Sequence, residues 1–346
     1  MRRLDYPFIR ACYGQETEYT PVWFMRQAGR FLPSYKKIKA SRNVLELAKN
    51  PELASEVVVD AVRALGVDAG IIFADIMLPL ESMGVTFRIE EDVGPIVSNP
   101  VRGPGDVARL RRLDPETDLS YVYEGIDRTI QKLDGRTPLI GFSGAPFTLA
   151  AYMIEGGPSR ELAKTRALMY SSPETWRPLM RTLTDMVKDY LSAQLKHGVA
   201  AVQLFDSWVG CLSPLDYRQF VLPFTREIFT SIRSVPRIHF CAYSSALVEE
   251  FHRTGPEVLS VDWRIPIEDV WRRCGDVTSV QGNLDPAVAL AGGAEMDRHA
   301  TEILARAKGK EGHIFSLGHG VLRDTDPENL RQIVNLVHTS TGRVNK

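Results

Sequence analysis

Residues 200–208 read AAVQLFDSW, an apolar run of strand length that ends abruptly in an aspartate, a serine and a tryptophan. Short apolar or β-branched runs of this kind are typical of buried strands in α/β proteins. Seven more recur along the chain: PVWFM (21–25), AGIIF (69–73), PLIGF (138–142), RIHF (237–240), VLSVD (258–262), TSVQG (278–282) and HIFSL (313–317). The sequence therefore predicts eight strands spread over the whole chain.

Segments with a helical spacing of apolar residues lie between these runs. Residues 53–65 and 330–337 are two of them, and Asp326 and Pro327 before the second are a helix start signal. Eight strand–helix units without a second compositional regime predict an α/β fold, a single (β/α)8 TIM-type barrel domain over residues 1–346. The main alternative is an open doubly wound sheet. Such a sheet usually carries a Gly-rich nucleotide turn after an early strand, and none follows these runs.

The connection between the second and third runs is unusually long. Residues 74–137 exceed a plain strand-to-helix connection, so we expect an extended insertion near the barrel mouth. Within it, VTFRI and GPIVS flank Glu90-Glu91-Asp92 and predict a β-hairpin that folds over the mouth. Residues 1–20 precede the first run and are expected to form an N-terminal extension.

The bulk composition is that of a water-soluble globular protein, with 44% apolar residues, 25% charged residues and a net charge of −1. A nearly neutral chain gives no indication of nucleic acid or a membrane surface as a partner. No run approaches the ~18 apolar residues of a membrane span, and the N-terminus lacks the apolar core of a signal peptide. Four scattered cysteines without a CxxC pair indicate free thiols, so we expect a cytoplasmic protein.

Polar side chains follow every one of the eight runs, where a (β/α)8 barrel carries its active site. The most prominent are Arg26, Gln27, Arg30, Asp75, Ser143, Tyr152, Asp206, Ser207, His239, Asp262, Asn283 and His319. Because the net charge supplies no general field, the two arginines at the first exit indicate a local site for an anion. Guanidinium groups suit carboxylates best, since their donors match both oxygens.

Each candidate also has a structural interpretation. Two arginines four residues apart are as often a solvated face, although Gly29 between them favours a loop that enters a site. Asp75 is more often a helix cap, since IMLPLESMG after it could begin a helix. Tyr152 and Ser207 carry no functional signal on their own. His319 lies between two glycines, which permit close approach of a ligand to the backbone and favour a functional role.

Two long blocks, PVWFMRQAGRFLPSY (21–35) and GFSGAPFTLAAYMIEGG (141–157), resemble the signature blocks of the uroporphyrinogen decarboxylase family. The resemblance runs from about residue 5 to residue 340 and includes IIFADIMLPLESMG (71–84), VQLFDSWVGCLSP (202–214), VQGNLDP (280–286) and FSLGHGVLRDTDPENL (315–330). It implies a (β/α)8 carboxy-lyase that removes the four acetate carboxyl groups of uroporphyrinogen III, giving coproporphyrinogen III and CO2 in haem and tetrapyrrole biosynthesis. It also implies a cytoplasmic homodimer that needs no metal and no organic cofactor.

The matching blocks imply roles for individual residues. By position in the blocks, the substrate-contacting residues are Arg26, Gln27, Ala28, Gly29, Arg30, Asp75, Tyr152, Ser207 and His319. Asp75 matches the aspartate that binds the tetrapyrrole and stabilises the transition state. Arg26 and a bound water are the candidates for the proton donor. Phe31, Ser34 and Ser316 depart from the usual Tyr, Glu and Asn without removing a charged contact.

Two other functional classes fit parts of the sequence. Zinc-dependent methyltransferases with this barrel, which act on corrinoids and thiols, use a His-x-Cys pair and a later cysteine. His239 and Cys241 have that spacing, but catalytic zinc needs three protein ligands, and Cys274 falls in a predicted helix. We therefore interpret His239 and Cys241 as packing residues inside the barrel. A non-catalytic tetrapyrrole-binding protein is disfavoured because Asp75 and both arginines are present.

Overall fold

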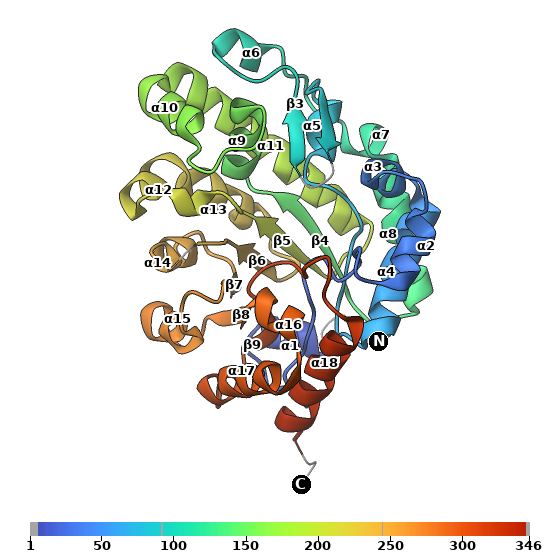
Figure 1. Ribbon diagram of the computed structural model, residues 1–346. Coiled ribbons are helices and arrows are strands. Elements are labelled where there is room, and N and C mark those ends of the chain that lie inside the picture. The colour runs from blue at the N-terminus through green and yellow to red at the C-terminus, as the bar shows by residue number, and fades with distance from the viewer. Residues whose placement is uncertain (1–5, 91–92, 244, 344–346) are drawn as a thin grey trace.

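A curled parallel sheet forms the centre of the molecule, and helices surround it (Figure 1). The computed structural model describes residues 6–90, 93–243 and 245–343. Seven strands follow one another in the order β1-β4-β5-β6-β7-β8-β9. Their bounds are Gly70–Ile71 (β1), Leu139–Gly144 (β4), Ala201–Phe205 (β5), Arg237–Phe240 (β6), Val258–Ser260 (β7), Ser279–Leu284 (β8) and His313–Leu317 (β9). Each overlaps one of the predicted runs, which confirms the predicted fold class.

The first predicted strand, residues 21–25, differs from the others. It forms an isolated parallel bridge between Val22 and Phe315 of β9, and Phe315 N donates to Pro21 O at 2.9 Å. On its other side, Asp68 N donates to Val22 O at 2.8 Å, and the Asp68 carboxylate accepts from Val22 N at 2.7 Å. The segment thus joins the two edges of the sheet. It is a bridge and not a strand because Pro21 has no N–H and a side chain replaces a backbone partner.

Polar side chains form hydrogen bonds across the interior of the barrel, between neighbouring and distant strands. Gln281 of β8 accepts a hydrogen bond from Trp23 Nε1 at 2.8 Å and donates to Gln203 Oε1 of β5 at 3.2 Å. Its amide nitrogen also donates to Ser260 Oγ of β7 at 2.8 Å. All four side chains are buried, so each bond satisfies a group that would otherwise be costly to desolvate. The network ties the first segment to the far wall of the barrel.

The Gln27 side chain also connects the first segment to the sheet. Its side-chain oxygen accepts from Phe24 N at 3.1 Å, and its side-chain nitrogen donates to Ala69 O at 2.9 Å, just before β1. The side chain is only 1% exposed. Both ends of the amide are therefore used to connect the first segment to the neighbouring strand.

We expect Gln27→Ala to lower the free energy of unfolding by roughly 2–5 kcal/mol, because a buried N–H and a buried C=O each lose their partner. Urea denaturation of the purified protein measures this change. Gln15→Ala, at an exposed position, is the control and should leave the midpoint unchanged. A Gln27→Ala protein as stable as the wild type would show that the closing bonds contribute nothing.

Helices cover the outside of the sheet (Figure 1). The main ones are Pro51–Leu65 (α4), Ser120–Leu133 (α8), Pro173–Lys196 (α11), Leu222–Ser231 (α13), Val248–His252 (α14), Ile267–Cys274 (α15), Gly293–Arg306 (α17) and Pro327–Thr341 (α18). Both helices predicted from apolar spacing, α4 and α18, are confirmed. Asp326 caps α18 by accepting from Glu328 N at 2.9 Å, as its start signal predicts.

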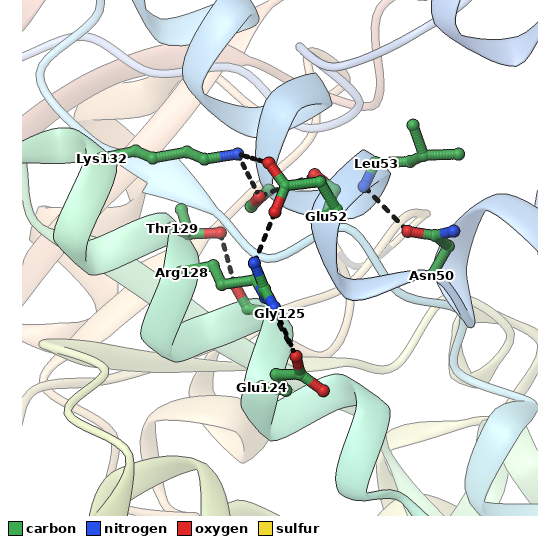
Figure 2. A network of polar contacts seen from close by, with 9 residues as sticks. Asn50, Glu52, Leu53, Glu124, Gly125, Arg128, Thr129 and Lys132 are labelled. Atoms are coloured by element: carbon green, nitrogen blue, oxygen red, sulfur yellow. Dashed lines mark hydrogen bonds and ion pairs between the residues drawn. The ribbon is translucent and has the colours of Figure 1, made fainter.

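The contact between α4 and α8 shows how the outer helices are fixed (Figure 2). Glu52 accepts from Arg128 at 2.5 Å and from Lys132 at 2.6 Å. Exposed ion pairs of this kind contribute little to stability. The helices also pack directly, since a Cβ on Gly125 would lie 3.8 Å from Pro51 Cα, an ordinary van der Waals distance. Packing therefore contributes more to this contact than the exposed ion pairs.

The long insertion contains several small elements. They are Leu78–Ser82 (α5), Phe87–Glu90 (β2), Gly94–Val97 (β3), Pro104–Ala108 (α6) and Pro115–Asp118 (α7), before α8. The predicted hairpin is present, since β2 and β3 pair antiparallel; residues 91 and 92 of its turn lie outside the described residues. Val97 N donates to Gly156 O at 2.9 Å, so the hairpin packs against the end of α9 (Pro146–Glu155). That it covers the mouth stays a prediction.

The amino end of the barrel is covered by α1 (Pro7–Cys12), since Ser279 Oγ at the start of β8 donates to Ala11 O at 2.9 Å. The remaining helices are Pro33–Lys39 (α2), Val44–Ala48 (α3), Ala163–Ser171 (α10), Pro214–Phe220 (α12), Pro286–Ala291 (α16) and the 3-10 turn Val209–Cys211. None of the four cysteines forms a disulfide. Within the described residues, no helix combines the length and apolarity needed to cross a membrane.

Candidate active site

The RQAGR block forms a tight turn directly after the first segment. Arg26 is exposed and has a φ of 61°, a left-handed conformation that costs an arginine on the order of 1–2 kcal/mol. Gly29 is required for this turn, because a Cβ there would lie 2.7 Å from Arg26 O. Arg30 is partly exposed in the same loop. The strained turn thus presents Arg26 to solvent at the carboxyl end of the barrel.

The predicted site residues of this turn differ in their exposure to solvent. Ala28 and Gly29 are partly exposed, whereas the Gln27 side chain is buried in the barrel wall with both polar atoms bonded to backbone. The predicted substrate contact of Gln27 is therefore not available through its side chain. The sequence alone could not indicate this, because the partner carbonyl belongs to Ala69, 42 residues away.

A glycine loop after β9 holds His319 beside the arginine turn. A Cβ on Gly320 would lie 2.5 Å from Arg26 Cδ, and a Cβ on Gly318 would lie 2.7 Å from Trp263 N. Gly318 is required because backbone atoms approach it closely, and Gly320 lets the Arg26 side chain lie against the loop. His319 is therefore fixed between the exit of β7 and the RQAGR turn, with its ring 5.7 Å from that of Phe240.

His319 is neutral at neutral pH. Burial lowers its pKa to about 4, the nearby guanidiniums of Arg26 and Arg264 act in the same direction, and Asp262 acts against them. A neutral imidazole has one N–H donor and one acceptor. His319 can therefore donate a single hydrogen bond to a substrate carboxylate without adding a charge to the site.

A pH dependence of stability follows from His319 and from buried His313, whose pKa burial also lowers from 6.5 to about 4. Between these values the unfolded chain binds more protons than the folded one, so the free energy of unfolding should fall as the pH drops from about 6.5 to 4. We expect His313→Gln to make this slope shallower by about 1.4 kcal/mol per pH unit, measured by urea denaturation at several pH values. An unchanged slope would show that His313 is protonated in the folded protein.

The two carboxylate oxygens of Asp75 have different surroundings. Its Oδ1 accepts from Met77 N at 2.8 Å in the turn before α5, but it is not the helix cap, because the N-cap residue of α5 is Met77 and has no side-chain cap bond. Its Oδ2 has no hydrogen-bond partner within the described residues. Burial raises the pKa of Asp75, while the Met77 N–H and the charge of Arg26 lower it. One oxygen is thus fixed by the backbone and the other is left for a ligand near Arg26.

Tyr152 and Ser207 lie on two elements that one hydrogen-bond chain connects. Asp206 Oδ1, after β5, accepts from Thr148 Oγ1 of α9 at 2.9 Å, and Thr148 Oγ1 lies 3.4 Å from Trp208 N. Tyr152, one turn further along α9, packs its ring against Trp208 at 5.9 Å. These contacts place the loop that carries Ser207 beside the helix that carries Tyr152.

Electrostatic effects show which groups share one space. Burial raises the pKa of Tyr152, a hydrogen bond from Trp208 opposes that shift, and the charges of Asp75 and Arg26 act on it as well. Arg26 also acts on Asp75 and on His319. The structure therefore brings together Arg26, Asp75, Tyr152 and His319. The sequence interpretation overlooked Arg264 beside His319, although it directly follows the Asp262 and Trp263 of a noted strand exit.

The histidine–cysteine pair at β6 does not form part of this site. The ring of His239 packs against Phe229 of α13 at 5.3 Å and Phe251 of α14 at 4.6 Å, so it faces the helical layer. The expectation that it packs inside the barrel is wrong, because side chains alternate along a strand and Phe240 takes the inner position. Cys274 Sγ faces Val248 O at 3.7 Å. In the described part of the chain, no three His, Cys, Asp or Glu side chains are placed to hold a metal ion.

A parallel barrel with arginine, carboxylate, tyrosine and histidine side chains at its carboxyl end defines an enzyme of the barrel class, with a site whose side chains suit an anionic substrate. The family model described as "Uroporphyrinogen decarboxylase (URO-D)" matches residues 4–340. The chain belongs to the uroporphyrinogen decarboxylase family. Curated relatives named uroporphyrinogen decarboxylase include one from Nocardia farcinica, 49% identical over 97% of both chains. Another, from Streptomyces coelicolor, is 47% identical over 98% of this chain and 96% of its own.

Solved structures with a similar fold are more distant. A methyltransferase from Methanosarcina mazei superposes with a TM-score of 0.77 at 17% identity, covering 96% of this chain and 98% of that one. A B12-independent methionine synthase from a Shewanella species has a TM-score of 0.59 at 9% identity, covering 85% and 89%. At these identities the likeness concerns the fold alone. Nothing in these comparisons favours the alternative methyltransferase function.

Proposed function

We propose that this chain is a carboxy-lyase that converts uroporphyrinogen III into coproporphyrinogen III by removing its four acetate carboxyl groups. Membership of the family over nearly the whole chain supports the reaction. The observation that carries the assignment to this site is the position of Asp75, with one oxygen fixed by Met77 N and Arg26 within electrostatic reach. These features suit a substrate with hydrogen-bond donors at its centre and carboxylates at its rim.

Asp75 is proposed to bind the centre of the macrocycle. A porphyrinogen directs four pyrrole N–H groups inward, and an ionised carboxylate can accept several hydrogen bonds at once. Protonation of a pyrrole carbon makes the ring cationic, so the electrons of the breaking C–CO2 bond flow into the ring. CO2 leaves, a proton added at the exocyclic carbon completes a methyl group, and the ring carbon then loses its added proton, which restores the pyrrole. A fixed carboxylate beside the cation stabilises it without reorganisation.

The rim of the substrate is proposed to be held by the arginine turn and His319. Arg26 and Arg30 bind carboxylates, for which the guanidinium donors are matched, and neutral His319 donates one further hydrogen bond. Tyr152 and Ser207 contact the substrate from the side of α9 and β5. A guanidinium is a weak acid, so either Arg26 or a bound water delivers the proton.

The pyrrole itself acts as the electron sink, the role that an organic cofactor takes in other decarboxylases. We therefore propose that the reaction proceeds without a metal or an organic cofactor. We also propose that the active protein is a cytoplasmic homodimer, in keeping with the family resemblance.

The test is to incubate the purified protein with uroporphyrinogen III under anaerobic conditions and to separate the products by carboxyl number. Products with seven to four carboxyl groups are expected. Metal analysis of the same sample addresses the methyltransferase alternative, which needs bound zinc in stoichiometric amount. An unchanged substrate together with one zinc per chain would favour that alternative.

A further inference from the structure

Arg264 lies at the exit of β7, and two aromatic rings restrain its side chain. Its guanidinium carbon lies 4.0 Å from the ring centre of Tyr243 and 4.0 Å from that of Trp263. Contacts with two aromatic rings restrain the guanidinium and leave its remaining N–H groups for hydrogen bonds. The side chain is 34% exposed, so these groups can be reached from solvent.

Asp262 holds Arg264 and Tyr243 in this arrangement through hydrogen bonds. This fully buried carboxylate accepts from Arg264 Nη1 at 2.8 Å and from Arg264 N at 3.0 Å, and it also accepts from Tyr243 N at 2.5 Å. Tyr243 has a φ of 58°, a strained conformation for a tyrosine that is itself 62% exposed. One carboxylate therefore orients both the arginine and one of its stacking rings.

The guanidinium still has donors to offer. Within the described residues, Arg264 Nη2 and Nε have no hydrogen-bond partner. A stacked, anchored guanidinium with a free edge is suited to bind a carboxylate through two parallel hydrogen bonds.

The glycine loop after β9 contacts both the Arg26 side chain and the segment that carries Arg264. Gly318 packs against Trp263, the residue before Arg264, and Gly320 packs against the side chain of Arg26. His319 lies between them, and both arginines act electrostatically on it. Arg264 thus belongs to the mouth of the barrel, on the side away from the RQAGR turn.

We propose that Arg264 binds a rim carboxylate of the tetrapyrrole and forms, with Arg26 and Arg30, a set of basic groups on both sides of His319. This assignment rests on the proposed function. Uroporphyrinogen has eight carboxylates at its rim, so an arginine outside the RQAGR turn also has a carboxylate to bind. Tyr243 and Trp263 orient the guanidinium, and Asp262 prevents its rotation. The contact affects binding and not the chemical step, because Asp75 lies at another strand exit.

The test compares steady-state kinetics of Arg264→Gln with the wild type on uroporphyrinogen III. Loss of a charge-assisted pair should raise KM about tenfold or more and change kcat less than about threefold. Arg264→Lys, which keeps the charge but not the planar fork, should be intermediate. Tyr243→Asn, which tolerates the positive φ and removes one stacking ring, should show a smaller rise in KM. Arg136→Gln, an exposed position after α8, is the control and should match the wild type.

Binding of coproporphyrinogen III, measured by anaerobic calorimetry, separates this proposal from the function on which it rests. Weaker binding by Arg264→Gln and Tyr243→Asn supports it even for a wild-type protein that shows no turnover. Equal KM and equal Kd in wild type and Arg264→Gln overturn the Arg264 contact and leave the decarboxylase function standing. A fall in kcat at unchanged KM overturns it as well. A wild-type protein that neither binds coproporphyrinogen nor consumes uroporphyrinogen contradicts the function itself.

Discussion

Replacing Asp75 by asparagine is expected to lower kcat by about 100- to 1000-fold, the usual effect of removing one preorganised charge-stabilising group. The amide oxygen can still accept from Met77 N, so the start of α5 and the fold should be preserved. What is lost is the negative charge that would face the protonated pyrrole. The measurement is initial-rate CO2 release at saturating uroporphyrinogen, alongside the urea midpoint of each protein.

Asp134→Asn provides the matched control, because Asp134 is an exposed residue at the end of α8, far from the mouth. It should keep wild-type kcat. If Asp75→Asn retained wild-type turnover while folding normally, Asp75 would not be the group that stabilises the transition state. A large loss of turnover with an unchanged urea midpoint is the combination that supports its role.

Replacing Arg26 by asparagine is expected to lower kcat/KM by roughly 10- to 150-fold, mainly through KM, because a charge-assisted contact to a rim carboxylate is lost. Asparagine accepts a φ of 61° more readily than arginine, so the free energy of unfolding should be unchanged or slightly higher. An activity loss without a stability loss is the mark of a strained functional residue.

Arg42→Asn, at an exposed position in the following loop, is the control for Arg26. Steady-state kinetics and urea denaturation of the three proteins give both quantities. A loss confined to kcat would assign the proton transfer to Arg26 and contradict its role in positioning. Destabilisation would show instead that the strained turn depends on the arginine side chain.

The strand positions could be predicted because each is a local property of the sequence. A short apolar run followed by a polar residue, as in residues 200–208, needs no distant information. The exception is the segment at residues 21–25, which forms a bridge because Asp68 replaces a backbone partner of Val22. That replacement depends on a residue more than 40 positions away, so the sequence pattern could not reveal it.

At the site, the sequence could not predict the direction in which individual side chains point. Alternation along β6 requires His239 and Phe240 to face opposite sides, but it does not say which one faces inward. Gln27 lies inside a binding block, yet its amide is used to close the barrel. Arg264 directly follows the strand-exit residues Asp262 and Trp263, but its anchoring could not be predicted, because its stacking partner Tyr243 comes from a different strand exit.

Chelator-treated protein, with no metal or organic cofactor added, should remove the acetate carboxyl groups of uroporphyrinogen III with its own side chains and the substrate ring. Counting the CO2 released per uroporphyrinogen III is the decisive measurement. We expect about four molecules of CO2 and coproporphyrinogen III as the final product. No CO2, or release that returns only when a metal or cofactor is restored, would show that the side chains and the ring do not suffice.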